Sequence, residues 1–135
     1  MSNASGRYTA SRHCVYNISY HLIWCPKYRR PVLIDGVDKR LKELLNEKAA
    51  ELNIRIESME VMPDYVHMFV KSNPIIPVHH IVSQFKGHSS RVLRDEFPWL
   101  RSRLPSLWTH SYYCESIGHI SEETIRKYID DQKKV

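Results

Sequence analysis

The segment 65–71 (Tyr-Val-His-Met-Phe-Val-Lys) alternates between two kinds of side chain, and this alternation constrains the fold more than any other feature of the chain. Successive side chains of a β-strand point to opposite faces of a sheet. One face of this strand is therefore predicted to enter a core: Val66, Met68 and Val70. The opposite face carries Tyr65, His67 and Phe69. Burial on one side only is typical of an antiparallel sheet that is covered on a single face.

The patterns around this segment predict a βαββαβ order followed by one more helix. Residues 13–24 are rich in β-branched and aromatic side chains, and Pro26 ends that strand. The expected strands cover residues 13–24, 54–62, 65–71 and 107–117. The expected helices cover 37–53, 78–96 and a C-terminal segment with Ser121 as its N-cap. Residues 99–106 are expected to form a basic loop. This order predicts an α+β, ferredoxin-like antiparallel sheet with helices on one face and an added C-terminal helix.

Length and composition indicate one soluble domain that favours polyanionic partners. The chain has 135 residues, and its net charge is +5 with much of the positive charge clustered at 27–30 and 91–94. Residues 1–10 are expected to be a disordered terminus or an expression scar, and 11–135 a single domain. Three widely spaced cysteines without a CxxC exclude a zinc site or a disulfide framework and fit a reducing cytosol. No apolar run reaches the roughly 18 to 20 residues of a membrane span.

The C-terminal helix and the strand at 65–71 each carry a candidate reactive group. Tyr128 and Gln132 are four residues apart, so they share one face of a helix. A phenol that can attack phosphorus thus lies beside an amide oxygen that can bind a metal. His67 lies on the face of its strand that packing does not use, where it is free to bind a metal or a phosphate. Taken alone, each of these residues is better explained as an ordinary side chain at the surface, and the rest of the chain has to decide.

Five motifs occur in a distinctive order along the chain. They are Tyr20-His-Leu-Ile-Trp-Cys-Pro-Lys-Tyr-Arg-Arg30, Met59-Glu-Val-Met-Pro-Asp-Tyr-Val-His67, Phe85-Lys-Gly-His-Ser-Ser90, Leu107-Trp-Thr-His-Ser-Tyr-Tyr113 and Lys127-Tyr-Ile-Asp-Asp-Gln132. From about Tyr16 to Gln132 the chain resembles the HUH-type single-tyrosine transposases, the TnpA-like enzymes of the smallest bacterial and archaeal insertion sequences. On this resemblance, residues 11–135 are one HUH-type transposase domain.

The resemblance implies a mechanism, a cofactor and partners. Tyr128 would be the nucleophile that forms a 5′-phosphotyrosine, and His67 and Gln132 would be ligands of Mg²⁺ or Mn²⁺. The implied substrate is single-stranded DNA with hairpins at transposon ends. The implied assembly is a homodimer in which the helix that carries the tyrosine can dock against the metal site of the other protomer.

Tyr65 departs from the family pattern, because the family has a His-hydrophobic-His pair where this chain has Tyr65-Val66-His67. A phenol with a pKa near 10 is protonated at neutral pH and is a poorer metal ligand than imidazole. Three arrangements stay open: Tyr65 ligates as a phenolate or through water, another group fills the gap, or the protein is a weakened or inactive enzyme that still binds DNA. The groups available for the second arrangement are Asp64, Glu60 and His119. We favour a metal site of reduced affinity that includes Tyr65.

Two basic segments are candidate DNA contacts, because cations neutralise phosphates and aromatic rings stack on unpaired bases. The residues are Lys27, Tyr28, Arg29 and Arg30 in the first segment, and Lys86, Ser89, Ser90 and Arg91 in the second. For any one of them a solvated charged surface is an equally good explanation, but as a set, and with the family resemblance, they favour contact with DNA. A generic RNA-binding module of the same fold is disfavoured, since the predicted sheet has no RNP aromatic signature.

Overall fold

The computed structural model describes residues 9–10, 14–117 and 122–132. The strands are β1 (Thr9–Ala10), β2 (Val15–Tyr16), β3 (Ile18–Trp24), β4 (Arg55–Met62), β5 (Tyr65–Ser72) and β6 (Tyr113–Ile117). The helices are the 3₁₀ turn η1 (Lys27–Arg29), α1 (Val37–Glu51), α2 (Val78–Glu96), α3 (Trp99–Arg103) and α4 (Glu122–Gln132). In the described residues, no helix is long and apolar enough to cross a membrane.

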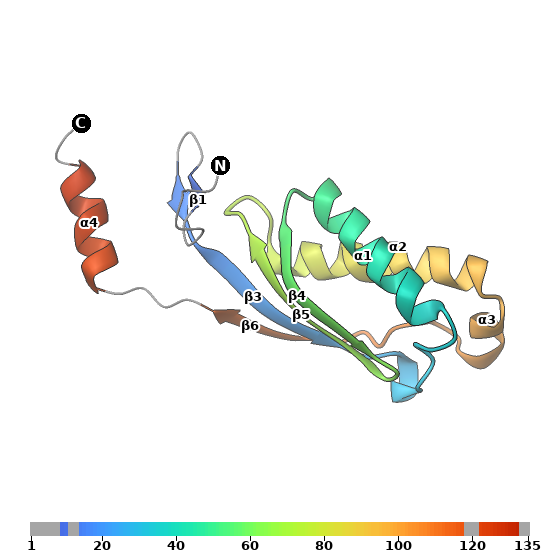
Figure 1. The fold of residues 1–135 in the computed structure, drawn as a ribbon. Coiled ribbons are helices and arrows are strands. Elements are labelled where there is room, and N and C mark those ends of the chain that lie inside the picture. The colour runs from blue at the N-terminus through green and yellow to red at the C-terminus, as the bar shows by residue number, and fades with distance from the viewer. Residues whose placement is uncertain (1–8, 11–13, 118–121, 133–135) are drawn as a thin grey trace.

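Strands β3 to β6 form one antiparallel sheet in the order β4-β5-β3-β6, which confirms the ferredoxin-like prediction. Helices α1 and α2 lie together on one face of this sheet (Figure 1). No helix of the described residues covers the other face, which we call the open face. The short strands β1 and β2 pair with each other in a separate two-stranded sheet. The middle of the open face is formed by the two central strands, β5 and β3, each of which has a neighbouring strand on both sides.

The core lies between the sheet and the two helices. On β5 the exposure alternates along the strand, and the three side chains predicted to face the core are fully buried: Val66, Met68 and Val70. They pack in one cluster with the apolar faces of α1 and α2, including Leu41, Leu45, Ile81 and Phe85. The predicted side-chain directions of β5 are therefore confirmed, and Tyr65, His67 and Phe69 stand on the open face.

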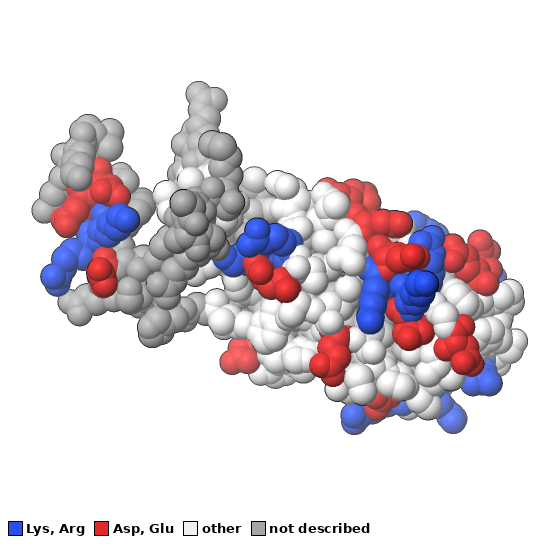
Figure 2. Space-filling view, in the orientation of Figure 1, with Lys and Arg blue, Asp and Glu red and all other residues white. Residues whose placement is uncertain are grey.

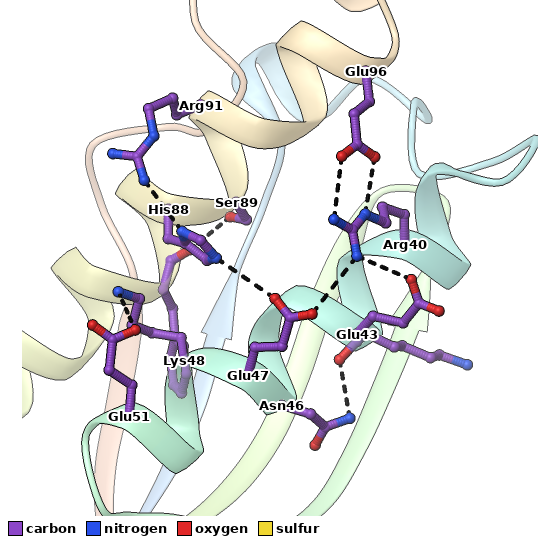
Figure 3. A network of polar contacts seen from close by, with 12 residues as sticks. Arg40, Glu43, Asn46, Glu47, Lys48, Glu51, His88, Ser89, Arg91 and Glu96 are labelled. Atoms are coloured by element: carbon purple, nitrogen blue, oxygen red, sulfur yellow. Dashed lines mark hydrogen bonds and ion pairs between the residues drawn. The ribbon is translucent and has the colours of Figure 1, made fainter.

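A polar network joins the outer surfaces of α1 and α2 (Figure 3). Arg40 of α1 donates two hydrogen bonds to Glu96 at the end of α2, at 2.9 and 3.2 Å, and one to Glu43 in its own helix. Glu47 of α1 lies within ion-pair distance of both Arg40 and His88. The hydrogen bonds to Glu96 and Glu43 raise the pKa of Arg40, and its guanidinium links α1 to the end of α2.

Three segments differ from the sequence prediction by more than the shifts of one or two residues seen in the other elements. The strand expected at 13–24 is broken, because Asn17 separates β2 from β3. The basic loop expected at 99–106 contains α3, which Leu100 and Leu104 anchor by burying their side chains one helical turn apart. The strand expected at 107–117 is confined to residues 113–117.

The shortened last strand has a clear cause. Residue Trp108 forms only an isolated bridge with Pro26, which has no N–H with which to extend a ladder. The ammonium group of Lys86 donates hydrogen bonds to the carbonyl oxygens of Thr109 and Ser111, at 2.7 and 2.9 Å. These two carbonyls therefore bond to a side chain of α2 and not to a neighbouring strand. Residues 107–109 stay bonded to the segment that follows β3, because Lys27 N donates to the Leu107 carbonyl at 2.8 Å and Thr109 N to the Cys25 carbonyl at 3.1 Å. Thr109, His110 and Tyr112 lie beside α2.

Candidate functional site on the open face of the sheet

His21 of β3 and His67 of β5 meet on the open face of the sheet. In the strand register, His67 is opposite Ile23 and His21 is opposite Phe69, so the two histidines are diagonal neighbours. Their Nε2 atoms face each other directly, and their ring centroids are 4.3 Å apart. The sequence analysis assigned no role to His21. It could have been found only by knowing the register of β3 against β5.

The surroundings of His21 fix its orientation. Its ring stacks on Phe69, with centroids 4.6 Å apart and planes inclined by 15°. Glu115 lies opposite it on β6, and the carboxylate Oε2 is 3.8 Å from His21 Nδ1. The hydroxyl of Tyr113 donates a hydrogen bond to the same Glu115 oxygen at 3.2 Å, and this bond raises the pKa of Tyr113.

Tyr65 directs its hydroxyl to Glu60, which lies opposite His67 in the register of β4 and β5. This hydroxyl donates a hydrogen bond to Oε1 of Glu60 at 3.3 Å. Burial, followed by the charge of Glu60 and this hydrogen bond, raises the pKa of Tyr65. The phenol is therefore neutral at physiological pH, and the local electrostatics oppose a phenolate ligand.

The first basic segment lies at the end of the sheet where β4 turns into β5. Arg29 Nε donates a hydrogen bond at 3.1 Å to Asp64, the residue just before Tyr65. Tyr28 is 64% exposed, with the ammonium of Lys27 5.4 Å from its ring centre. Tyr28 and Arg29 both have left-handed backbone conformations, which turn the chain sharply and present their side chains to solvent. Arg30 is exposed beside them.

The second basic segment divides into exposed and structural residues. Ser89 is fully buried: its hydroxyl donates to the Phe85 carbonyl at 2.6 Å and accepts from Trp108 Nε1 at 3.0 Å. This burial removes Ser89 from the residues that we expect at a DNA surface. Lys86 is half-buried and bonded to two carbonyls, and burial lowers its pKa. Arg91 is exposed, and Ser90 lines a cavity of about 340 Å³ between α2 and residues 106–112.

The charge distribution narrows the surface on which DNA could lie. Figure 2 shows that basic and acidic side chains are interleaved on the side of the molecule that carries α1. Several of these charges already pair with each other, as Arg40 does with Glu96 and Lys48 with Glu51. A polyanion gains little from such a mixed surface, because each phosphate would meet carboxylates as well as cations. The segment 27–30, in which Tyr28, Arg29 and Arg30 are exposed and Lys27 is half-buried, is a better candidate.

Tyr128 and Gln132 both lie in α4, as predicted, but their side chains are outside the described part of the structure. So are Ser121, the expected N-cap, and His119, one of the alternative ligands. Figure 1 shows α4 beyond the end of β6 and apart from the sheet and its two helices. The structure thus brings His21 and His67 together and leaves the helix of Tyr128 at a distance from them within one chain.

The donor set suits a divalent cation only in part. Two imidazole nitrogens converge on the open face, and such nitrogens bind Mn²⁺ and related divalent ions. Among the described residues, no group of three or more histidine, cysteine, aspartate or glutamate side chains is arranged to hold a metal. A site on this face therefore needs a further donor from another part of the chain or from the substrate.

Comparison with known proteins identifies relatives over almost the whole chain. A family described as "Transposase IS200 like" matches residues 14–132. The ISDra2 transposase TnpA of Deinococcus radiodurans is 37% identical over 123 residues, which are 90% of this chain and 88% of that protein. The IS200 transposase of Salmonella typhimurium is 28% identical over 89% of this chain and 80% of its own length.

Two solved structures share the fold. One is a crystal structure, at 1.90 Å resolution, of a Deinococcus radiodurans protein assigned as a transposase. It is 35% identical, has a TM-score of 0.75, and the match covers 92% of this chain and 97% of that one. The other is a REP-associated tyrosine transposase bound to a REP hairpin, which is 12% identical with a TM-score of 0.59 over 90% of this chain and 68% of that one.

Proposed function

Because the chain belongs to the family of IS200-like transposases, we propose that it cleaves and rejoins single-stranded, hairpin-bearing DNA at transposon ends. The observation that carries the proposal is the family match over residues 14–132, which includes both Tyr128 on a terminal helix and His67 on the open sheet face. A transposase of this family moves DNA. Its use of single strands, a tyrosine and a metal is the part that we propose.

In the proposed reaction, the Tyr128 hydroxyl oxygen attacks a backbone phosphorus. The new bond is a 5′-phosphotyrosine, the bond from phosphorus to the 3′ oxygen breaks, and the proton lost by the phenol is balanced by the proton gained by the leaving 3′ oxygen. The reverse attack by a 3′-OH releases Tyr128, so rejoining needs no ATP. A divalent cation, when bound, polarises the phosphate, and we assign His67 and Gln132 to hold it.

Tyr65 takes a secondary part in this proposal. The hydrogen bond to Glu60 and the raised pKa favour a neutral phenol, so ligation through a bridging water is the form of the predicted Tyr65 contact that its chemistry allows. Mg²⁺ and Mn²⁺ both retain waters in such sites. The aromatic ring would also provide a surface against which an unpaired base can stack.

The DNA is proposed to approach over residues 27–30. These residues are charged or aromatic and lie at the Asp64 end of the open face, which also carries Tyr65 and His67. The hairpin in the structure of the REP-associated relative supports a folded DNA substrate for this chain too. The separation of α4 from the sheet in one chain is compatible with a homodimer in which α4 of one protomer serves the sheet of the other.

A covalent-adduct assay tests the proposed function. The protein is incubated with end-labelled hairpin-bearing single-stranded DNA and Mn²⁺, and denaturing gels are used to detect a protein–DNA adduct. We expect an adduct with the wild-type chain and none with Tyr128→Phe, which removes only the hydroxyl. Tyr16→Phe, the same change at a tyrosine of β2 outside the candidate site, is the matched control, and it should still form the adduct. An adduct that persists in Tyr128→Phe would refute the assignment of the nucleophile.

A second candidate function is DNA binding without cleavage. The raised pKa of Tyr65 favours it, because a neutral phenol is a poor metal ligand. If the phenol cannot complete the metal site, the chain binds hairpins and forms no adduct. The variant Tyr65→His then distinguishes the two functions. Adduct formation only in Tyr65→His identifies a lapsed enzyme, whereas adduct in the wild type establishes an active one. If neither the wild type nor Tyr65→His forms an adduct, the proposed strand-transfer mechanism is refuted.

A further inference from the structure

The geometry points to His21 as a metal ligand that replaces the imidazole missing at Tyr65. We propose that His21 and His67, on neighbouring strands, hold one divalent cation between their Nε2 atoms, with Glu115 as the positioning residue behind His21. This inference rests on the proposed metal-dependent function and names a ligand that the sequence pattern does not contain. It makes the site a cross-strand pair instead of a pair within β5.

The direction of the two rings carries the inference. The Nε2 atoms of His21 and His67 face each other, and the side chains converge from β3 and β5 across the sheet. Two imidazoles aimed at one point of an open face are what a cation with nitrogen ligands requires. By contrast, Tyr65 directs its hydroxyl toward Glu60 on β4, the strand on the other side of β5.

His21 has a carboxylate neighbour, Glu115, at ion-pair distance from its second ring nitrogen. Metal-bound histidines usually present their second ring nitrogen to a carboxylate or carbonyl, which fixes the tautomer and the ring direction. Glu115 Oε2 lies 3.8 Å from His21 Nδ1 and is itself held by the Tyr113 hydroxyl. Stacking against Phe69 fixes the plane of the ring. The side chain of His21 keeps 20% of its surface exposed, so a cation can reach it from solvent.

Two imidazoles also make a prediction about metal preference. Imidazole nitrogen suits Mn²⁺, Co²⁺ and Zn²⁺, whereas Mg²⁺ prefers oxygen donors. A site with His21 and His67 should therefore bind Mn²⁺ more tightly than Mg²⁺. A site with His67 as its one imidazole and otherwise oxygen donors would discriminate less.

The test measures Mn²⁺ binding directly, from the electron paramagnetic resonance signal of free Mn²⁺ in titrations of the full chain without DNA. His21→Phe keeps an aromatic ring to stack on Phe69 and removes both nitrogens. We expect it to weaken binding by about a hundredfold, and Glu115→Gln to weaken it by about tenfold. His80→Phe, the same change at an exposed histidine of α2, should leave the affinity unchanged. Unchanged affinity in a folded His21→Phe would overturn the inference.

A measurement on the wild-type chain keeps the inference testable if His21→Phe does not fold. Long-range ¹H–¹⁵N spectra of the imidazoles, recorded during addition of Zn²⁺ as a diamagnetic probe, report each ring nitrogen separately. The inference requires the Nε2 signals of His21 and His67 to shift together at one stoichiometry. A shift of His67 alone, or of neither, would overturn it.

Failure of this inference is distinguishable from failure of the proposed function. Wild-type adduct formation together with unchanged Mn²⁺ affinity in His21→Phe removes His21 from the site and leaves the strand-transfer function intact. Absence of any adduct together with His21-dependent Mn²⁺ binding leaves the cross-strand metal site and removes the proposed reaction.

Discussion

The variant Ser89→Ala separates a structural role from a DNA contact within one motif. The Ser89 hydroxyl is fully buried and accepts a hydrogen bond from Trp108 Nε1 at 3.0 Å, and Trp108 is only 6% exposed. Alanine removes the acceptor and leaves a buried indole N–H without a partner, which costs about 1–3 kcal/mol. The second bond, to the Phe85 carbonyl, adds little because that oxygen lies within a helix. For a chain of this length the loss corresponds to a fall in Tm of roughly 4–10 °C.

Thermal unfolding followed by circular dichroism, with DNA binding measured well below the transition, checks this prediction. Ser90→Ala is the matched control, because Ser90 is the next residue of α2 and is only partly buried. We expect it to melt within about 1 °C of the wild type, as surface substitutions usually do. The reasoning is refuted if Ser89→Ala leaves Tm unchanged, or if it weakens DNA binding at full stability, because either result would make the hydroxyl a ligand contact.

Three further predictions concern backbone strain, pH dependence and DNA affinity. Gly36→Ala should lower stability by about 1 kcal/mol in urea unfolding, because Gly36 has φ +95° and the cost is the left-handed backbone. Burial, followed by the charges of Lys48 and Arg91, lowers the pKa of His88 below 6.5. Stability should therefore fall as pH drops from about 6.5 toward that lowered pKa, and His88→Gln should flatten this dependence in urea titrations at pH 7 and 5. Arg29→Ala should weaken single-stranded DNA binding and reduce the salt slope by about 1 in titrations at several salt concentrations.

Most of the fold was predictable, because the side-chain pattern of each helix and strand is contained in its own short segment of sequence. The alternation at 65–71 and the helical spacing in α1 and α2 each require only neighbouring residues, and both are confirmed with boundaries shifted by one or two positions. The larger errors lie at Asn17, where the expected first strand is broken, and at 99–112. In the latter segment the burial of Leu100 and Leu104 stabilises α3, and the hydrogen bonds from Lys86 to two carbonyl oxygens hold residues 109–111 against α2, so that the strand begins only at residue 113. Both depend on contacts between segments, which local patterns do not contain.

The basic motif around α2 shows why residue type is a poor guide to a binding role. Lys86, Ser89 and Arg91 look alike as candidate phosphate contacts in the sequence, yet only Arg91 is exposed. Position along the helix decides the difference, because Ser89 falls on the buried face with Phe85 and Leu93 at helical spacing. A helical projection of 78–96 would have placed Ser89 inside, and the apparent motif concealed that signal.

Of the two histidines in the candidate metal site, only His67 could be placed from the sequence, and the geometry of the sheet explains why. His67 could be placed on the open face from the alternation of its own strand, because the period of two fixes the direction of every side chain. His21 could not be paired with it, since the register of β3 against β5 is set by the packing of the whole sheet and not by either strand alone. A substitution within β5, such as Tyr65, therefore looks like a lost ligand when only one strand is considered. In the assembled sheet the neighbouring strand offers an imidazole to the same point, and loss of a motif residue is not loss of the site.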